Sequence, residues 1–147
     1  MNSYFYDFDI YISSEEDIPS ALLQGDNEKK LLVIVNAADY TAENKAFLAK
    51  ILSAISYDLD KDANVLVLPK EKSYSVTSLI KNGFYTNVLI FGINLKDIGF
   101  SVSTYLYAPF EIAGKTYLIN HPLEKVKSSV DFKKSLWTAL QAMPFNK

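Results

Sequence analysis

Four short runs of apolar residues dominate the hydrophobic pattern of the chain. Nearly every position within each run is apolar, which is typical of strands that are buried on both faces of a parallel sheet. Polar, Gly- or Pro-containing stretches separate the runs, so each is expected to be a separate strand. The predicted strands are residues 31–35, 65–68, 88–92 and 117–119.

Between these runs the apolar residues recur at the three- and four-residue spacing of amphipathic helices. Thr41 is the expected N-cap of a helix over residues 42–56, and a shorter helix is expected over 75–81. Ser128 and Asp131 fit a capping box, which predicts a last helix that runs to Met143. One helical turn is expected over 94–97.

Strands that alternate with helices favour an α/β fold. We therefore expect a three-layer α/β/α domain with a mostly parallel central sheet of about four strands. Residues 104–112 are β-rich but contain Pro109, which suits an edge strand or an extended loop. The expected organisation is an N-terminal arm and lead-in over 1–28 and a single α/β domain over 29–147.

The first residues of the chain combine aromatic and acidic side chains. They form either an edge strand that packs on the domain or an arm that binds a partner, because exposed aromatic residues are typical interface anchors. The aromatic residues concerned are Tyr4, Phe5, Tyr6 and Phe8, which are interspersed with aspartates.

Composition excludes several classes of chemistry. The 147 residues include no Cys, one His and no Arg, and the net charge is −2. Cys-based and His-rich metal sites are therefore excluded, no cofactor is expected, and tight direct nucleic-acid binding is disfavoured without a basic face. No targeting segment or membrane span is indicated, so a cytoplasmic protein without membrane contact is expected.

In parallel α/β sheets, sites form outside the carboxyl ends of the strands. Here these ends are followed by residues 36–40, 69–73, 92–94 and 120–122, none of which contains a Gly-rich phosphate loop. Asp39 and His121 form one candidate pair that would activate a water. The structural alternative makes Asp39 a turn or helix-entry residue and His121 a residue of the strand end.

The sequence "LINHPLEKVKSSVDFKKSLWTAL" resembles the last motif of the uracil-DNA glycosylase-like fold, in which His-Pro ends a strand and a later helix carries a tryptophan. His121, Pro122 and Trp137 match these positions. The resemblance places the first-motif loop at residues 36–40, where Asn36 replaces an expected glycine, Asp39 lies near the acid position and Tyr40 takes the place of the base-stacking aromatic. This degraded loop predicts a catalytically inactive member of the fold.

The chain also resembles the psi-subunit family of the bacterial DNA polymerase III holoenzyme, through "ALLQGD" and the pair Leu136-Trp137. This resemblance implies a non-catalytic protein-binding subunit. Its arm, residues 2–12, would dock on the clamp-loader ATPase subunits, and its globular part would contact a second accessory subunit. Asn36, Tyr40 and His121 are further candidate binding residues. The alternatives are an active base-excision enzyme that uses Asp39 and His121, and a flavodoxin-type domain, which the single hydroxyl residue of "NAADYT" disfavours.

Overall fold

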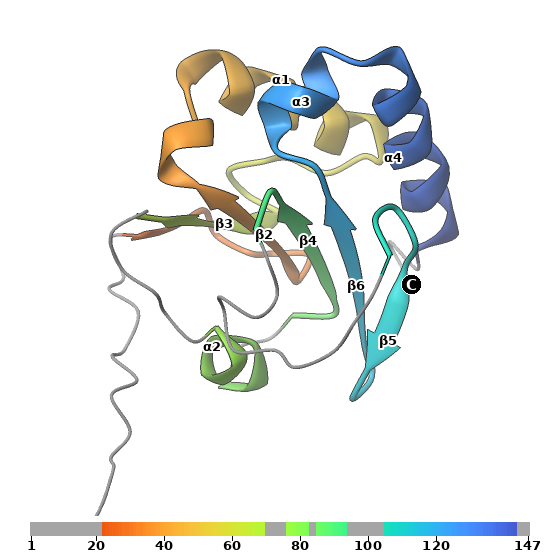
Figure 1. The fold of residues 1–147 in the computed structure, drawn as a ribbon. Coiled ribbons are helices and arrows are strands. Elements are labelled where there is room, and N and C mark those ends of the chain that lie inside the picture. Colours follow the sequence, from red (N-terminus) through yellow and green to blue (C-terminus); the bar gives the residue numbers. More distant parts are fainter. Residues whose placement is uncertain (1–21, 70–75, 83–84, 94–104, 144–147) are drawn as a thin grey trace, which may run out of the picture.

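The computed structural model describes residues 22–69, 76–82, 85–93 and 105–143. These residues form a mixed α/β fold with one six-stranded sheet and four α-helices (Figure 1). The N-terminal arm, the expected helical turn over 94–97 and most of the loop that follows Pro69 lie outside the described residues.

The sheet contains all four predicted strands and two short ones. The order is β1-β3-β2-β4-β6-β5, in which the four inner strands are parallel and the two edge strands are antiparallel. The expected sheet of about four strands is thus corrected to a mixed sheet of six. The strands are β1 (Leu23–Gln24), β2 (Leu31–Asn36), β3 (Ala63–Leu68), β4 (Asn87–Phe91), β5 (Phe110–Ile112) and β6 (Lys115–Asn120).

The two edge strands explain why the sequence pattern underestimated the sheet. β1 has only two residues, which is too short to show any periodicity. β5 follows Pro109 directly and forms a hairpin with β6 through Ala113 and Gly114, both of which have positive φ. The prediction of an edge strand or extended loop over residues 104–112 is therefore confirmed as an edge strand for residues 110–112, whereas residues 105–109 belong to no strand.

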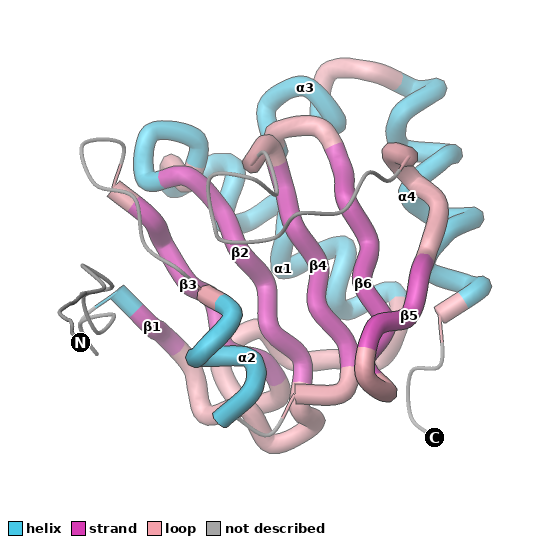
Figure 2. Tube along the Cα trace, turned by 60° about the horizontal axis from the view of Figure 1, so that its bottom comes forward, coloured by secondary structure: helices cyan, strands magenta, loops and turns pink. Residues whose placement is uncertain are grey.

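Helices lie on both faces of the sheet, and each face has its own hydrophobic core (Figures 1 and 2). α1 (Ala42–Ala54), α3 (Leu123–Lys127) and α4 (Val130–Ala142) cover one face, whereas α2 (Thr77–Asn82) packs on the other. Successive residues of β2 supply the two cores in turn, since Val33 belongs to the first and Ile34 to the second. Both side chains are fully buried, as continuous apolar runs predict.

The N-terminus of α1 has the predicted cap, whereas that of α4 has a different one. The Thr41 side chain accepts a hydrogen bond from the Asn44 amide, which confirms the predicted N-cap of α1. The predicted capping box of α4 is wrong by one residue, because Ser129 caps the helix by accepting from the Phe132 amide. Ser128 instead donates its hydroxyl to the Glu124 carbonyl, since it ends the separate helix α3. None of the helices among the described residues is long and apolar enough to cross a membrane.

Candidate functional site

The carboxyl ends of three parallel strands meet at one edge of the sheet, as the sequence predicted. The Asn36 side chain at the end of β2 donates to the Gly92 carbonyl after β4, at 2.9 Å. The Gly92 amide in turn donates to the Asn120 carbonyl at the end of β6, also at 2.9 Å. The candidate segments after β2, β4 and β6 are therefore joined by hydrogen bonds and form one candidate site.

Gly92 brings the segment after β4 into close contact with the His-Pro segment. Its φ is +67°, and a Cβ at this position would lie 2.7 Å from Cγ of Pro122. A side chain is excluded both by the left-handed backbone and by this contact. The close approach leaves no space between Gly92 and Pro122 for a ligand group.

Asp39 is held by backbone groups at the start of α3. One carboxylate oxygen accepts from the Leu123 amide at 2.5 Å, and the other accepts from the Glu124 amide at 3.1 Å. The Asn44 side chain also donates to the Asp39 carbonyl, at 2.7 Å. These bonds make Asp39 the cap of a helix that begins 84 residues further along the chain.

Tyr40, the candidate stacking aromatic, is half-buried and packs against the core under α1. Its hydroxyl is buried and has no hydrogen-bond partner among the described residues. Burial, and then the negative charge of Asp60, raises the pKa of Tyr40 to about 12. The phenol is therefore neutral at physiological pH, and its ring contributes to packing.

His121 has an aromatic environment rather than an acidic one. Its Nδ1 lies 2.8 Å from the Tyr107 hydroxyl, and its ring stacks on Phe132 with 4.1 Å between the ring centroids. Burial, and then the positive charge of Lys125, lowers the pKa of His121 below its ordinary value of 6.5. The imidazole is therefore neutral at pH 7, and Tyr107 rather than Asp39 is its hydrogen-bond partner.

Sequence reasoning missed the two aromatic partners of His121. Tyr107 lies in the β-rich segment before β5, and its backbone, with φ of +59°, is held by a 2.8 Å hydrogen bond from its amide to the Ile119 carbonyl. Phe132 lies in α4, a segment for which the sequence predicted only a helix. No local signal marks either residue, because both reach His121 through the pairing of β6 with its neighbours and the packing of α4.

The remaining candidate residues cannot be assigned a place. Tyr4, Phe5, Tyr6 and Phe8 lie outside the described residues. Within the described part of the chain, no cluster of three or more His, Asp or Glu side chains is arranged to hold a metal ion. The described chemistry of the site thus consists of the Asp39 carboxylate, a neutral imidazole, a tyrosine hydroxyl and stacked aromatic rings.

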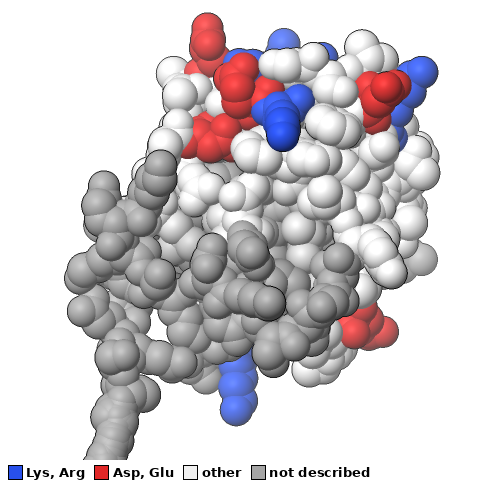
Figure 3. Space-filling view, viewed as in Figure 1, with Lys and Arg blue, Asp and Glu red and all other residues white. Residues whose placement is uncertain are grey.

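The charged side chains form no surface of a single sign on the face shown in Figure 3. There, lysines and carboxylates are intermixed around the helices at the top of the view. Lys127, for example, lies 3.2 Å from Glu124 and 3.8 Å from Glu43. A duplex-binding surface normally needs a basic stripe, and the described residues form none on this face.

No protein-family model and no curated protein matches the chain. The contacts at the carboxyl edge of the sheet therefore carry the functional argument.

Proposed function

We propose that the protein is a non-catalytic, cytoplasmic protein-binding subunit, similar to the psi subunit of the bacterial DNA polymerase III clamp-loader assembly. Its fold would be a catalytically degenerate form of the three-layer uracil-DNA glycosylase-like fold. The observation that carries this proposal is the use of Asp39, since both of its carboxylate oxygens accept hydrogen bonds from backbone amides. These bonds give Asp39 a structural role at the start of α3, which supports a fold that is used for binding.

The proposed partners follow from the sequence of the arm and from the resemblance. Residues 2–12 would bind the clamp-loader ATPase subunits through Tyr4, Phe5, Tyr6 and Phe8, and the globular part would bind a second accessory subunit. Aromatic side chains supply large contact areas and dominate the energetics of many interfaces. The mixed charge of the described residues on the face in Figure 3 supports protein rather than duplex binding.

Affinity purification of the tagged full chain from its native host tests this proposal. Mass spectrometry should identify clamp-loader ATPase subunits among the bound proteins, and a variant with Tyr6→Ser and Phe8→Ser should lose them. The matched control is Tyr105→Ser, which removes an aromatic side chain that is 83% exposed on the globular domain. Recovery of no clamp-loader subunit with the unmodified chain would contradict the proposal.

Base excision is the alternative function, and one observation favours it. His121 lies at the carboxyl edge of the sheet beside Tyr107 and Phe132, and a flipped base needs such an aromatic environment. A uracil-containing duplex incubated with the pure protein decides between the two functions. We expect no abasic sites, and abasic sites that disappear with His121→Ala would establish the alternative.

A further inference from the structure

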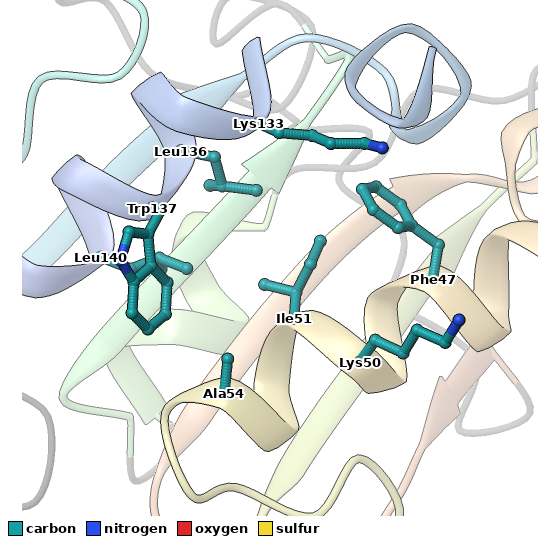
Figure 4. Close-up of a pocket in the computed structure, with 8 residues that line it drawn as sticks. All are labelled: Phe47, Lys50, Ile51, Ala54, Lys133, Leu136, Trp137 and Leu140. Atoms are coloured by element: carbon teal, nitrogen blue, oxygen red, sulfur yellow. The ribbon is translucent and has the colours of Figure 1, made fainter. Parts of the chain in front are cut away.

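An apolar groove lies between α1 and α4, in the helical layer on one face of the sheet (Figure 4). Its volume is about 220 Å³, and almost all of its surface is apolar. Trp137, the single tryptophan of the chain, forms part of one wall and remains 42% exposed. The apolar side chains that line the groove are Phe47, Ile51, Ala54, Leu136, Trp137 and Leu140.

Two lysines border this apolar surface. Lys50 comes from α1 and Lys133 from α4, and the Lys133 ammonium lies 5.9 Å from the ring centroid of Phe47. Neither lysine forms an ion pair with a carboxylate of the described residues. An occupant that matches this surface combines apolar or aromatic side chains with negative charge.

We infer that residues 2–12 of the same chain occupy this groove. The segment reads NSYFYDFDIYI, in which aromatic and β-branched residues surround Asp7 and Asp9. In an extended segment, alternate side chains point to opposite sides. Tyr6 and Phe8 would then face the apolar floor, and Asp7 and Asp9 would point outward, toward the exposed Lys50 and Lys133 at the border of the groove.

The length of the intervening chain permits this placement. From Ile12 to Leu22, where the described residues begin, ten residues span up to about 33 Å. β1 pairs with β3 and forms one edge of the sheet, as Figure 2 shows. Neighbouring strands are about 4.8 Å apart and a helix layer lies about 10 Å above its sheet, so the groove is within this span.

Because residues 2–12 are linked to the domain, weak contacts are sufficient to hold them in the groove. A segment that is linked by about ten residues meets its site at an effective concentration on the order of millimolar. The inference concerns the chain alone and does not depend on the proposed function. If the arm also binds clamp-loader subunits, the groove and the partner compete for Tyr6 and Phe8, so the groove holds the arm in an inhibited state.

Trp137 provides a direct test, because it is the only tryptophan and lines the groove. Acrylamide quenching of its fluorescence is measured in the full chain and in the variant with Tyr6→Ser and Phe8→Ser. Removal of the anchors should raise the quenching constant about twofold, since covering a half-exposed ring halves its accessibility. The matched control, Tyr11→Ser, changes a side chain on the opposite side of the extended segment and should have little effect. Equal quenching in all three proteins would overturn the inference.

Charge reversal provides the second test and does not depend on the aromatic variants. Lys50→Glu with Lys133→Glu should raise the quenching constant, and addition of Asp7→Lys with Asp9→Lys should restore it. Both lysines are exposed, so these variants are expected to fold. Failure of the second pair to restore protection would overturn the proposed ionic contacts.

The same-chain arrangement is tested separately. The chain has no Cys, so Ser3→Cys gives a unique site for an acceptor dye. Energy transfer from Trp137 to this dye should be independent of protein concentration. Transfer that disappears on dilution would show that the segment of a second copy occupies the groove, and it would overturn the same-chain inference.

Discussion

Replacement of Asp39 by alanine should destabilise the protein, because Asp39 joins the loop after β2 to the start of α3. The substitution removes two acceptors, which hold the Leu123 amide at 2.5 Å and the Glu124 amide at 3.1 Å. Leu123 is fully buried, so its amide cannot readily exchange the lost acceptor for water. The loss therefore combines a missing helix cap with an unpaired backbone donor.

The size of the effect follows from these contacts. Replacement of an N-cap carboxylate by alanine costs about 1 kcal/mol, and a single hydrogen bond to a charged group contributes about 1.5–3 kcal/mol. The two bonds share one carboxylate and cap one short helix, so we expect the free energy of unfolding to fall by about 2 kcal/mol. Asp39→Asn retains one acceptor oxygen and should lose about 1 kcal/mol.

Urea denaturation of the full chain measures this change. With a slope of about 2 kcal/mol per molar, a loss of about 2 kcal/mol lowers the midpoint by about 1 M. Glu43→Ala is the control, because the Glu43 side chain is 87% exposed and its ion pair should contribute less than about 0.5 kcal/mol. A catalytic carboxylate often opposes stability, so its removal leaves the midpoint unchanged or raises it. An Asp39→Ala midpoint equal to that of Glu43→Ala would therefore refute the structural role.

Three further predictions concern the same edge of the sheet and its turns. Gly92→Ala should lower the free energy of unfolding by about 3 kcal/mol because of strain and steric overlap. The control is Gly114→Ala, at a position with positive φ but no atom within 4 Å of the new Cβ, and it should lower the free energy by only about 1 kcal/mol in the same urea assay. Equal losses would contradict the close contact of Gly92 with Pro122. The ring protons of His121, the only histidine, should titrate in NMR spectra with a midpoint below 6.5, because burial and Lys125 lower its pKa. As the pH falls, His121 binds a proton in the unfolded chain before it does so in the folded chain. Its contribution to the free energy of unfolding is therefore complete above pH 6.5 and declines below that pH, and His121→Gln should remove this part of the decline. Tyr40→Phe should leave the urea midpoint unchanged or raise it slightly, because the buried hydroxyl has no partner among the described residues; a fall of more than about 1 kcal/mol would reveal a partner.

The central strands were predictable because burial dictates their composition. In β2, residues 31–35 are all fully buried, and a strand that is covered on both faces must be apolar at each position. The N-cap of α1 was predictable because its donor lies only three residues from Thr41. The central strands and the N-cap of α1 therefore depend on neighbouring residues, which the local sequence shows directly.

The edge strand β1 and the cap of α4 could not be predicted from the local sequence. β1 is defined by its pairing with Leu66 and Val65, which lie about forty residues away. Ser128 and Ser129 are equally suitable caps by type, and the choice between them depends on where α3 ends. The structure resolves it through the bond from the Ser128 hydroxyl to the Glu124 carbonyl.

The roles of Asp39 and His121 depend on long-range contacts and were therefore left open by the sequence. Asp39 binds the segment that directly follows His121-Pro122, so the two residues are neighbours in the architecture without being each other's partners. The carboxylate fixes the start of α3, and Tyr107 fixes the orientation of the imidazole. The same hydrogen bonds therefore order the loop after β2 and fix the start of α3, and they join two segments that lie 84 residues apart in the sequence.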